Sequence, residues 1–286
     1  MPLKPFGVEL RGWDPARELS DDDLAFIRDA LHRNVIVVFR GHPVPTNQEL
    51  ARFALRFGDV APAGEMYGIE LEQREVLQVS NELNADGKEK GVAGSGSIPW
   101  HTDYSFQVRA AKETVLEAFK LPPSGGPQTC FLNMYDAYET LPDSLRERID
   151  GLVARHTLHA AGQYSSPDVD PAEQEARARQ ANPNLHYPDD GAGVPHPVVM
   201  PHPETGRRSL YVSSFVQRFD GLPADEGRAL LDALLAHADQ PQRRYCHSWQ
   251  LGDMILSDQI GTVHSRGLVR AAEPRTMRQL STLIPA

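Results

Sequence analysis

The 286-residue sequence predicts a mainly β protein, with a barrel or jelly roll at its centre and helices packed outside it. Three observations predict this class. Short segments rich in β-branched and aromatic residues outnumber the helical segments, which occur near the start, the middle and the late part of the chain. The strands and helices alternate too irregularly for a doubly wound sheet. Neither GxGxxG nor GxxxxGK[ST] occurs, so the sequence lacks a phosphate-binding loop of either type.

The N-terminal elements follow local signals. Residues 20–34 predict a helix, because a serine caps the segment, acidic residues fill its first turn and apolar residues recur on one face. The run VIVVFRG at 35–41 predicts a buried strand that stops at a glycine. Residues 45–57 predict a second helix, with Thr46 or Asn47 as its cap.

The remaining elements are predicted in the same way. Runs of β-branched and aromatic residues predict strands, and proline or acidic residues at the start of an apolar periodic segment predict helices. The predicted strands lie at 75–81, 113–120, 128–134, 209–214, 253–257 and 278–284, and the predicted helices at 136–150 and 223–238.

Two long polar segments interrupt this pattern. Residues 84–99 are rich in glycine and lie just before a His-x-Asp motif, and residues 162–195 are polar and rich in proline. A connection as long as the second segment is usually a lid or a disordered insert, although a solvated surface excursion is the alternative. We expect one domain, 1–286, with an active-site lid or insert at 162–195, although the length also allows two smaller domains.

The composition limits the function classes. Apolar residues make up 40% of the chain, which excludes a disordered protein, and no apolar run approaches the ~20 residues of a membrane span. The N-terminus has no apolar core of a signal peptide, and the net charge of −10 argues against nucleic acid as a partner. Cys130 and Cys246 lie far apart in the sequence, which argues against a disulfide scaffold. We therefore expect a soluble, cytoplasmic protein.

The sharpest chemical signal is the motif Trp100-His101-Thr102-Asp103. In an extended segment, residues two apart share a face, so His101 and Asp103 could bind one metal ion together. A second histidine from elsewhere would complete a set of two histidines and one carboxylate, which leaves positions open and suits non-haem Fe(II) and O₂ chemistry. A surface His–Asp pair is the alternative for this motif alone.

A second signal lies near the C-terminus, where His264 and Arg275 are eleven residues apart. A histidine at the end of one strand and an arginine on the next could face one cavity. The histidine would bind metal, and the guanidinium would bind a carboxylate through two hydrogen bonds. A dicarboxylate that chelates iron needs such a partner for its distal carboxylate. Taken alone, Arg275 could equally be a surface residue.

Several longer segments, in the same order, resemble the taurine dioxygenase / 2,4-dichlorophenoxyacetate dioxygenase (TauD/TfdA) family of Fe(II)- and 2-oxoglutarate-dependent oxygenases. The N-terminal segment through ELARFALRFGDV resembles the start of the family's sequence. The segments WHTDYSF, GPQTCFLNMYDAYETL and HPVVMPHPETGRRSLYVS resemble three further motifs, and the C-terminal H-x(10)-R follows them. The resemblance covers nearly the whole chain.

The resemblance implies a double-stranded β-helix (a cupin-like jelly roll) and assigns roles to five residues. His101, Asp103 and His264 match the ligands of Fe(II). Thr129 and Arg275 match the residues that bind the distal carboxylate of the cosubstrate 2-oxoglutarate, and O₂ is the second cosubstrate. Relatives that halogenate their substrates lack the carboxylate ligand, so the presence of Asp103 disfavours halogenation.

The resemblance further implies hydroxylation of an unactivated C–H bond of a small organic molecule, coupled to decarboxylation of 2-oxoglutarate to succinate and CO₂. Desaturation or another oxidative rearrangement in a natural-product pathway is the alternative, and a non-catalytic jelly-roll binding protein is a remote one. We expect a small-molecule substrate as partner, and neither nucleic acid nor a membrane. Because relatives are often oligomers, a homodimer or homotetramer is compatible with the sequence.

Substrate recognition departs from the family's pattern at Gln279, where relatives that oxidise sulfonates or phenoxyacetates have an arginine that binds the substrate's anionic group. Glutamine supplies no charge, which shifts the expectation from sulfonates toward amino-acid-like or natural-product substrates, although Arg266 or Arg270 could supply a replacement cation. Further candidates for the substrate pocket, each with ordinary packing as the alternative, are Tyr67, Ser97, Tyr104 and Phe106.

Overall fold

The computed structural model covers the whole chain and describes residues 1–64, 71, 73–85, 87, 90–158, 193–270 and 272–285. All structural statements below refer to these ranges. Most of the lid expected at 162–195 lies outside them, because residues 159–192 are not described.

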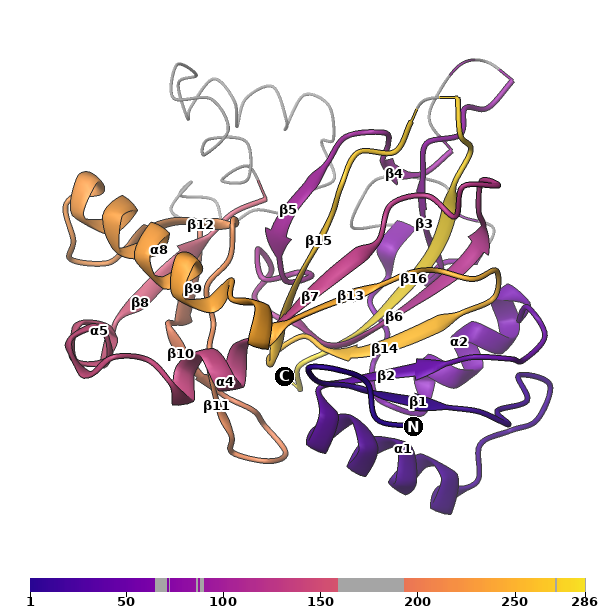
Figure 1. Cartoon of the computed structure of the whole chain (residues 1–286), viewed down its shortest axis with the longest axis horizontal. Helices are drawn as coiled ribbons and strands as arrows, with labels where there is room; N and C mark the ends of the chain where they lie inside the picture. The colour runs from indigo at the N-terminus through magenta and orange to yellow at the C-terminus, as the bar shows by residue number, and fades with distance from the viewer. Residues whose placement is uncertain are drawn as a thin grey trace.

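Two facing β-sheets form the centre of the molecule (Figure 1). In the described ranges, the larger sheet has the strand order β1-β2-β14-β6-β16-β3-β4, and the smaller sheet has the order β13-β7-β15-β5. The larger sheet consists of β1 (Val8–Leu10), β2 (Ile36–Phe39), β3 (Leu77–Ser80), β4 (Val92–Ala93), β6 (Ala111–Lys120), β14 (Met254–Asp258) and β16 (Thr276–Leu283). The smaller sheet consists of β5 (Ile98–His101), β7 (Thr129–Asn133), β13 (Arg244–His247) and β15 (Thr262–Arg266). This arrangement confirms the predicted jelly roll.

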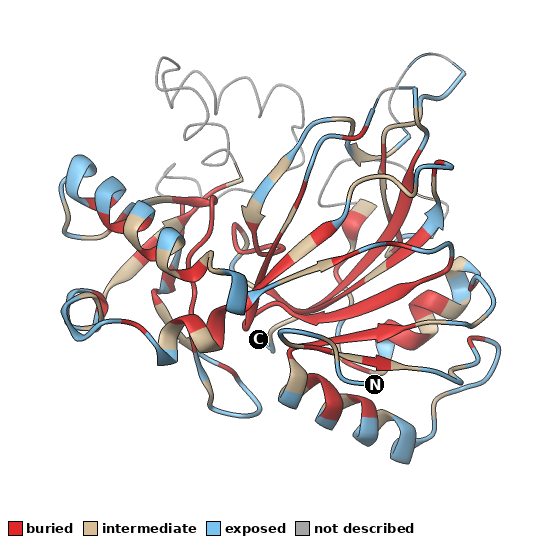
Figure 2. Cartoon of the chain, in the orientation of Figure 1, coloured by how far each residue is buried: buried red, intermediate tan, exposed pale blue. Residues whose placement is uncertain are grey.

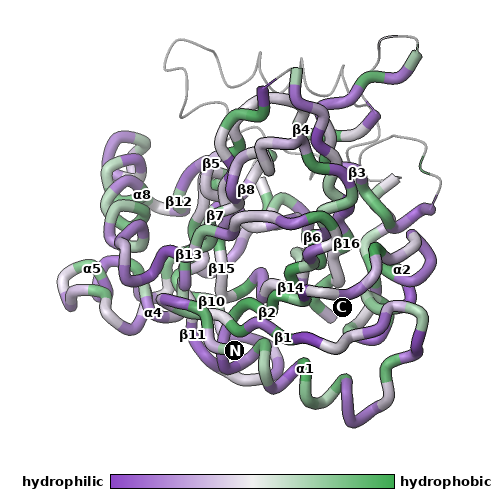
Figure 3. Tube along the Cα trace, turned by 45° about the vertical axis from the view of Figure 1, so that its right-hand side comes forward, coloured by the Kyte–Doolittle hydropathy of each residue, from purple (hydrophilic) through white to green (hydrophobic). Residues whose placement is uncertain are grey.

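The helices α1 (Asp21–Asn34) and α2 (Asn47–Leu55) cover the outer face of the larger sheet. Each begins with a capping box, made by Ser20 in α1 and by Thr46 in α2. Hydrophobic residues recur among hydrophilic ones along α1 (Figure 3), and its apolar face packs with α2 and the sheet. The core of this layer contains Ile27, Leu31, Leu50, Phe53, Phe57, Val37, Phe39, Val115, Met254 and Leu256.

A second layer packs beside the smaller sheet (Figure 1). It contains the strands β8 (Val153–His156), β9 (Val194–Pro197), β10 (Val199–Pro201), β11 (Arg208–Leu210) and β12 (Val216–Phe219). Its helices are α4 (Met134–Glu139), α5 (Asp143–Ile149), α8 (Ala224–Ala238) and the short 3₁₀ turn η1 (Pro241–Arg243). Leucines of α8 and residues of α4 share a core with Leu132 and Val263 of the smaller sheet. The outward face of α8 is exposed, whereas the central strands are largely buried (Figure 2).

Apolar side chains fill part of the space between the two sheets. Val38, Ile255 and Met277 of the larger sheet pack against Phe131 of the smaller sheet and against Trp249, which lies just after β13. This packing holds the sheets together beside the cavity described below, whose lining includes Met277.

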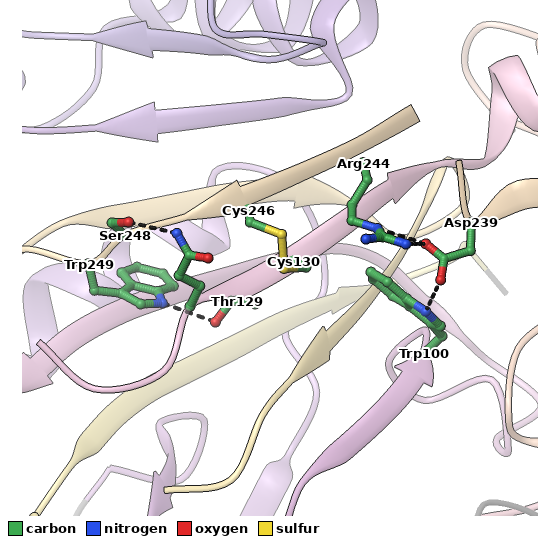
Figure 4. Close-up of a disulfide and its surroundings, with 9 residues drawn as sticks. Trp100, Thr129, Cys130, Asp239, Arg244, Cys246, Ser248 and Trp249 are labelled. Atoms are coloured by element: carbon green, nitrogen blue, oxygen red, sulfur yellow. Dashed lines mark hydrogen bonds and ion pairs between the residues drawn. A yellow bond between two sulfur atoms is a disulfide. The ribbon is translucent and has the colours of Figure 1, made fainter. Parts of the chain in front are cut away.

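The structure corrects two expectations. The helix expected at 136–150 is two helices, because the chain turns at 140–142 and Pro142 begins α5. Cys130 and Cys246 are bonded to each other as a disulfide (Figure 4), although their separation in the sequence argued against a disulfide scaffold. Strand pairing is the reason: β7 and β13 run antiparallel with Cys246 directly opposite Cys130, so the register joins cysteines 116 residues apart.

No helix in the described part of the chain is long and apolar enough to cross a bilayer.

Candidate active site

A cavity of about 320 Å³ lies between the two sheets. The smaller sheet supplies polar residues, and two further polar residues come from just outside the strands: Asp103 follows β5 and Arg275 precedes β16. The larger sheet supplies one wall with both apolar and polar side chains. The polar lining consists of His101, Asp103, Thr129, His264, Arg266, Arg275 and Gln279. The apolar lining includes Val79, Val92, Ile98, Phe106, Leu116, Leu158, Phe215 and Met277.

Strand pairing brings the three predicted metal ligands together. His101 ends β5 and lies directly opposite His264 of β15 in the ladder, while Asp103 follows β5 by two residues. The Nε2 atoms of His101 and His264 lie 3.7 and 3.8 Å from Oδ1 of Asp103. Among the described residues, these three form the one group of His, Cys, Asp or Glu side chains whose ligand atoms all lie within 4.8 Å of one another.

Hydrogen bonds on the far side of two ligands orient their metal-facing atoms. Nδ1 of His101 lies 2.9 Å from the carbonyl oxygen of Pro99, which can only accept, so Nδ1 carries the proton and Nε2 presents its lone pair. Oδ2 of Asp103 accepts a 2.8 Å hydrogen bond from Thr114, which leaves Oδ1 for a metal. His101 therefore presents Nε2 and Asp103 presents Oδ1 as free ligand atoms, and these two atoms lie close together.

The backbone of Asp103 is also fixed. The side-chain oxygen of Gln259 accepts hydrogen bonds from the Asp103 backbone N–H at 2.9 Å and from the Thr102 hydroxyl at 3.1 Å. Ser257 in turn accepts from the Gln259 side-chain amide. Sequence reasoning did not identify Thr114 or Gln259 as parts of this site, because only the pairing of β6 and β14 with the rest of the jelly roll brings them to Asp103.

His264 is suited to bind a metal as neutral imidazole. Burial, together with the nearby His101, lowers the pKa of His264 to about 3, although Asp103 acts in the opposite direction. Its Nδ1 is buried and has no hydrogen-bond partner among the described residues. Two imidazole nitrogens and one carboxylate oxygen that converge in this way fit a non-haem Fe(II) ion with open positions for other ligands.

The other end of the cavity is cationic. Arg275 is buried, and its Nε and Nη2 atoms have no hydrogen-bond partner among the described residues. Burial lowers the pKa of Arg275 to about 9, and the positive charge of Arg266 contributes to this. The backbone N–H of Arg275 donates to the side chain of Asn81 at 2.8 Å, which fixes the start of β16. Gly126 lies against the side chain, since a Cβ there would be 3.3 Å from Cδ of Arg275.

Thr129 and Arg266 lie side by side at this end. They are opposite each other in the pairing of β7 with β15, and both line the cavity. The Thr129 hydroxyl accepts a 3.0 Å hydrogen bond from the indole N–H of Trp249. The Arg266 guanidinium donates to the carbonyl oxygens of Ala93, Gly94 and Gly267, and its Nε is buried without a described partner. Burial lowers the pKa of Arg266.

The predicted substrate residues lie in different places. Phe106 and Gln279 line the cavity. Ser97 is exposed just before β5, and Tyr104 is buried against Phe106; within the described ranges, neither belongs to the cavity lining. Tyr67 lies outside the described residues.

Arg278 precedes Gln279 in β16, and successive residues of a strand point to opposite faces of the sheet. The structure places Arg278 on the face opposite Gln279, since its guanidinium donates to Glu117 at 2.8 Å on the side away from the cavity.

Comparison with known proteins agrees with this geometry. The model of the "Taurine catabolism dioxygenase TauD, TfdA family" matches residues 1–281. Pentalenolactone F synthase of Streptomyces arenae is 37% identical over 284 residues, covering 99% of this chain and 94% of the relative. The α-ketoglutarate-dependent 2,4-dichlorophenoxyacetate dioxygenase of Cupriavidus pinatubonensis is 31% identical over 296 residues, covering 99% and 96%.

The fold is also similar to solved structures. The crystal structure of AAD-2 in complex with Mn(II) and N-oxalylglycine superposes with a TM-score of 0.79 at 27% identity, covering 100% of this chain and 98% of that one. A taurine dioxygenase from Burkholderia xenovorans superposes with a TM-score of 0.74 at 26% identity, covering 99% and 90%. The match over nearly the whole chain, together with the converging ligand set, shows that the chain belongs to the TauD/TfdA family and is an Fe(II)- and 2-oxoglutarate-dependent dioxygenase.

Proposed function

We propose that this dioxygenase hydroxylates an unactivated C–H bond of a small organic molecule and converts 2-oxoglutarate to succinate and CO₂. The observation that carries the proposal is the arrangement of one cavity, with a His-Asp-His cluster at one end and at the other a buried arginine, two of whose nitrogens have no partner among the described residues. A ligand that both chelates the metal and ends in a carboxylate satisfies both ends at once.

Each residue at the two ends has a defined role in this proposal. His101 and His264 would hold Fe(II) through Nε2 and Asp103 through Oδ1, because these three atoms converge while Nδ1 of His101 and Oδ2 of Asp103 are engaged in hydrogen bonds. The bound iron supplies the O₂-activating chemistry. Arg275 and the hydroxyl of Thr129 bind the distal carboxylate of 2-oxoglutarate, which supplies the negative charge that the buried guanidinium lacks.

The rest of the cavity supports an apolar substrate group. Ile98, Phe106, Leu158 and Phe215 present carbon atoms to it, which excludes water and places C–H bonds near the metal cluster. Gln279 offers an amide hydrogen bond and no charge at its position in the lining. These features favour a substrate held mainly by apolar contacts.

A second outcome is desaturation or another oxidative rearrangement in a natural-product pathway. The specific observation in its favour is the relative named pentalenolactone F synthase, which is 37% identical over nearly the whole chain. The same metal cluster and cosubstrate residues would serve either outcome. The single-domain organisation, the cytoplasmic location and a homodimeric or homotetrameric state stay predictions of the sequence.

The test is a panel of small apolar molecules incubated with the protein, Fe(II), 2-oxoglutarate and O₂, scored by succinate release. A substrate should stimulate succinate formation only when Fe(II) is present, and His101→Ala should abolish the stimulation. Product mass then separates the two outcomes, since hydroxylation adds one oxygen atom and desaturation removes two hydrogen atoms. Full substrate-stimulated succinate formation by His101→Ala would refute the assignment of the metal site.

A further inference from the structure

We propose that Trp249 is a positioning residue for 2-oxoglutarate: its indole N–H fixes the Thr129 hydroxyl so that this hydroxyl donates its proton into the cavity. The inference rests on the proposed function, because it concerns the end of the cavity assigned to the distal carboxylate. Trp249 lies just after β13, outside the His-x-Asp motif and the His264–Arg275 segment, and the sequence did not indicate it as a site residue.

The contact is buried and direct. Nε1 of Trp249 lies 3.0 Å from Oγ1 of Thr129, with both residues shielded from solvent at 6% and 2% exposure (Figure 4). Thr129 also belongs to the cavity lining, together with Arg275 and with Arg266, its partner in the pairing of β7 with β15. The Thr129 side chain therefore contacts the indole and also belongs to the cavity wall.

The chemistry of the two groups sets the direction of the hydrogen bonds. An indole N–H can only donate, and a threonine hydroxyl carries one proton and two lone pairs. Trp249 therefore occupies a lone pair of Thr129 and disfavours rotamers that point the hydroxyl proton at the indole. The proton is left to point into the cavity, where Arg275 also offers only donors. An end that offers donors alone suits a carboxylate, and a hydroxyl with its lone pair turned toward that carboxylate would repel it.

The indole ring of Trp249 also packs against a neighbouring side chain. The ring of His247 packs edge-on against it, with centroids 4.6 Å apart, and Nε2 of His247 lies 3.0 Å from Oδ2 of Asp253. Asp253 also accepts from Arg40. In the pairing of β7 with β13, His247 lies opposite Thr129, and the Cys130–Cys246 disulfide joins the next pair of residues (Figure 4). The acceptor thus lies on β7 and the donor two residues beyond β13, and the register of these two strands is fixed by backbone pairing and a covalent bond.

The experiment measures binding of 2-oxoglutarate by calorimetry to the Mn(II)-loaded full-length protein. Trp249→Phe keeps an aromatic ring against His247 and removes the N–H. The loss of one neutral hydrogen bond predicts roughly two- to tenfold weaker binding of 2-oxoglutarate. In Fe(II)-dependent turnover, KM for 2-oxoglutarate should rise by the same factor while kcat at saturating 2-oxoglutarate is unchanged. Trp13→Phe, in the outer layer against Phe39 and Phe53, is the matched control and should leave binding unchanged.

A double-mutant cycle separates positioning from general destabilisation. Thr129→Val removes the hydroxyl, and adding Trp249→Phe to it should weaken 2-oxoglutarate binding no further, because the indole has no hydroxyl left to orient. A second probe is 2-oxopentanoate, which has a methyl group in place of the distal carboxylate. Its binding should not change in Trp249→Phe. Thermal unfolding of each variant identifies loss of fold.

The outcomes also distinguish this inference from the function on which it rests. If wild-type protein binds 2-oxoglutarate and Thr129→Val weakens it, but a folded Trp249→Phe binds normally, the inference about Trp249 is wrong and the proposed site stands. The inference is also wrong if Trp249→Phe lowers the affinity for 2-oxoglutarate by the same factor in the wild type and in Thr129→Val. If neither the wild type nor any variant binds 2-oxoglutarate, the proposed function itself fails.

Discussion

The two ends of the cavity are built in opposite ways. At the metal end, Asp103 and His101 already have hydrogen-bond partners that aim their free atoms, supplied by Thr114 and Pro99. At the cationic end, Arg275 is buried beside Arg266, and nitrogens of both lack a described partner. The metal end is therefore pre-organised by the protein, whereas we propose that 2-oxoglutarate completes the cationic end. Metal affinity should therefore depend on the side chains next to the ligands, and the stability of the cationic end should depend on the presence of 2-oxoglutarate.

The largest effect is expected from Arg275→Met, which changes the cationic end of the cavity and leaves the three metal-binding side chains in place. Removing the guanidinium should weaken 2-oxoglutarate binding roughly 30-fold or more, since truncating one partner of a buried charge pair costs ~2 kcal/mol upward. The same change should raise the unfolding temperature of the ligand-free protein, because it removes a buried charge that has no counterion in the described part of the chain. Calorimetry measures the loss of 2-oxoglutarate affinity, and thermal unfolding measures the rise in unfolding temperature.

Added 2-oxoglutarate supplies the control for this comparison. Saturating ligand with Mn(II) should stabilise the wild type more than Arg275→Met, since stabilisation follows the ratio of ligand concentration to Kd. A ligand-free Arg275→Met protein that is less stable than the wild type would show that the cationic end is already balanced without its ligand.

The metal end is tested by Thr114→Val, which keeps the shape of the side chain and removes the hydroxyl. Thr114 has one hydroxyl proton and gives it to Asp103, so Ser281, 2.7 Å away, must donate to Thr114. Loss of an outer hydrogen bond to a metal ligand typically costs about 10- to 100-fold in metal affinity. We expect weaker Fe(II) and Mn(II) binding by this factor, measured by calorimetry.

Thr114→Ser is the matched control, because it restores the hydroxyl at the same position. It should recover most of the metal affinity that Thr114→Val loses. Ser281→Ala should have a smaller effect than Thr114→Val, since it removes only the donor to Thr114. Equal metal affinity in Thr114→Val and the wild type would mean that Asp103 is oriented by its backbone contacts alone.

How much of this the sequence could predict depends on how local each signal is. His101 and Asp103 lie two residues apart, and the helix caps Ser20 and Thr46 are set within one turn, so these features follow from short segments. The jelly roll, too, was expected and is confirmed. His264 and Arg275 needed the family's pattern, because nothing in their own neighbourhood requires that they face one cavity.

The features that the sequence did not predict all depend on strand register. Thr114, Gln259 and Trp249 are ordinary residues in their own segments and meet Asp103 or Thr129 only after β6, β14 and β13 have paired. The disulfide is the clearest case. Cys130 and Cys246 are separated by 116 residues, and only the ladder of β7 with β13 places them opposite each other. Short-range patterns carry no information about such pairs.

The smallest expected effect is the pH dependence of the cationic end. Burial and Arg266 lower the pKa of Arg275 to about 9, so the charge that a carboxylate needs is present below that pH and is lost above it. The affinity for 2-oxoglutarate should therefore be flat from pH 7 to about 9 and then fall, approaching about tenfold per pH unit. Calorimetry of the Mn(II)-loaded protein across this range measures it. In Arg275→Met the slope should vanish, and a slope that persists in that variant would assign the titration to the metal end instead, which reverses the comparison.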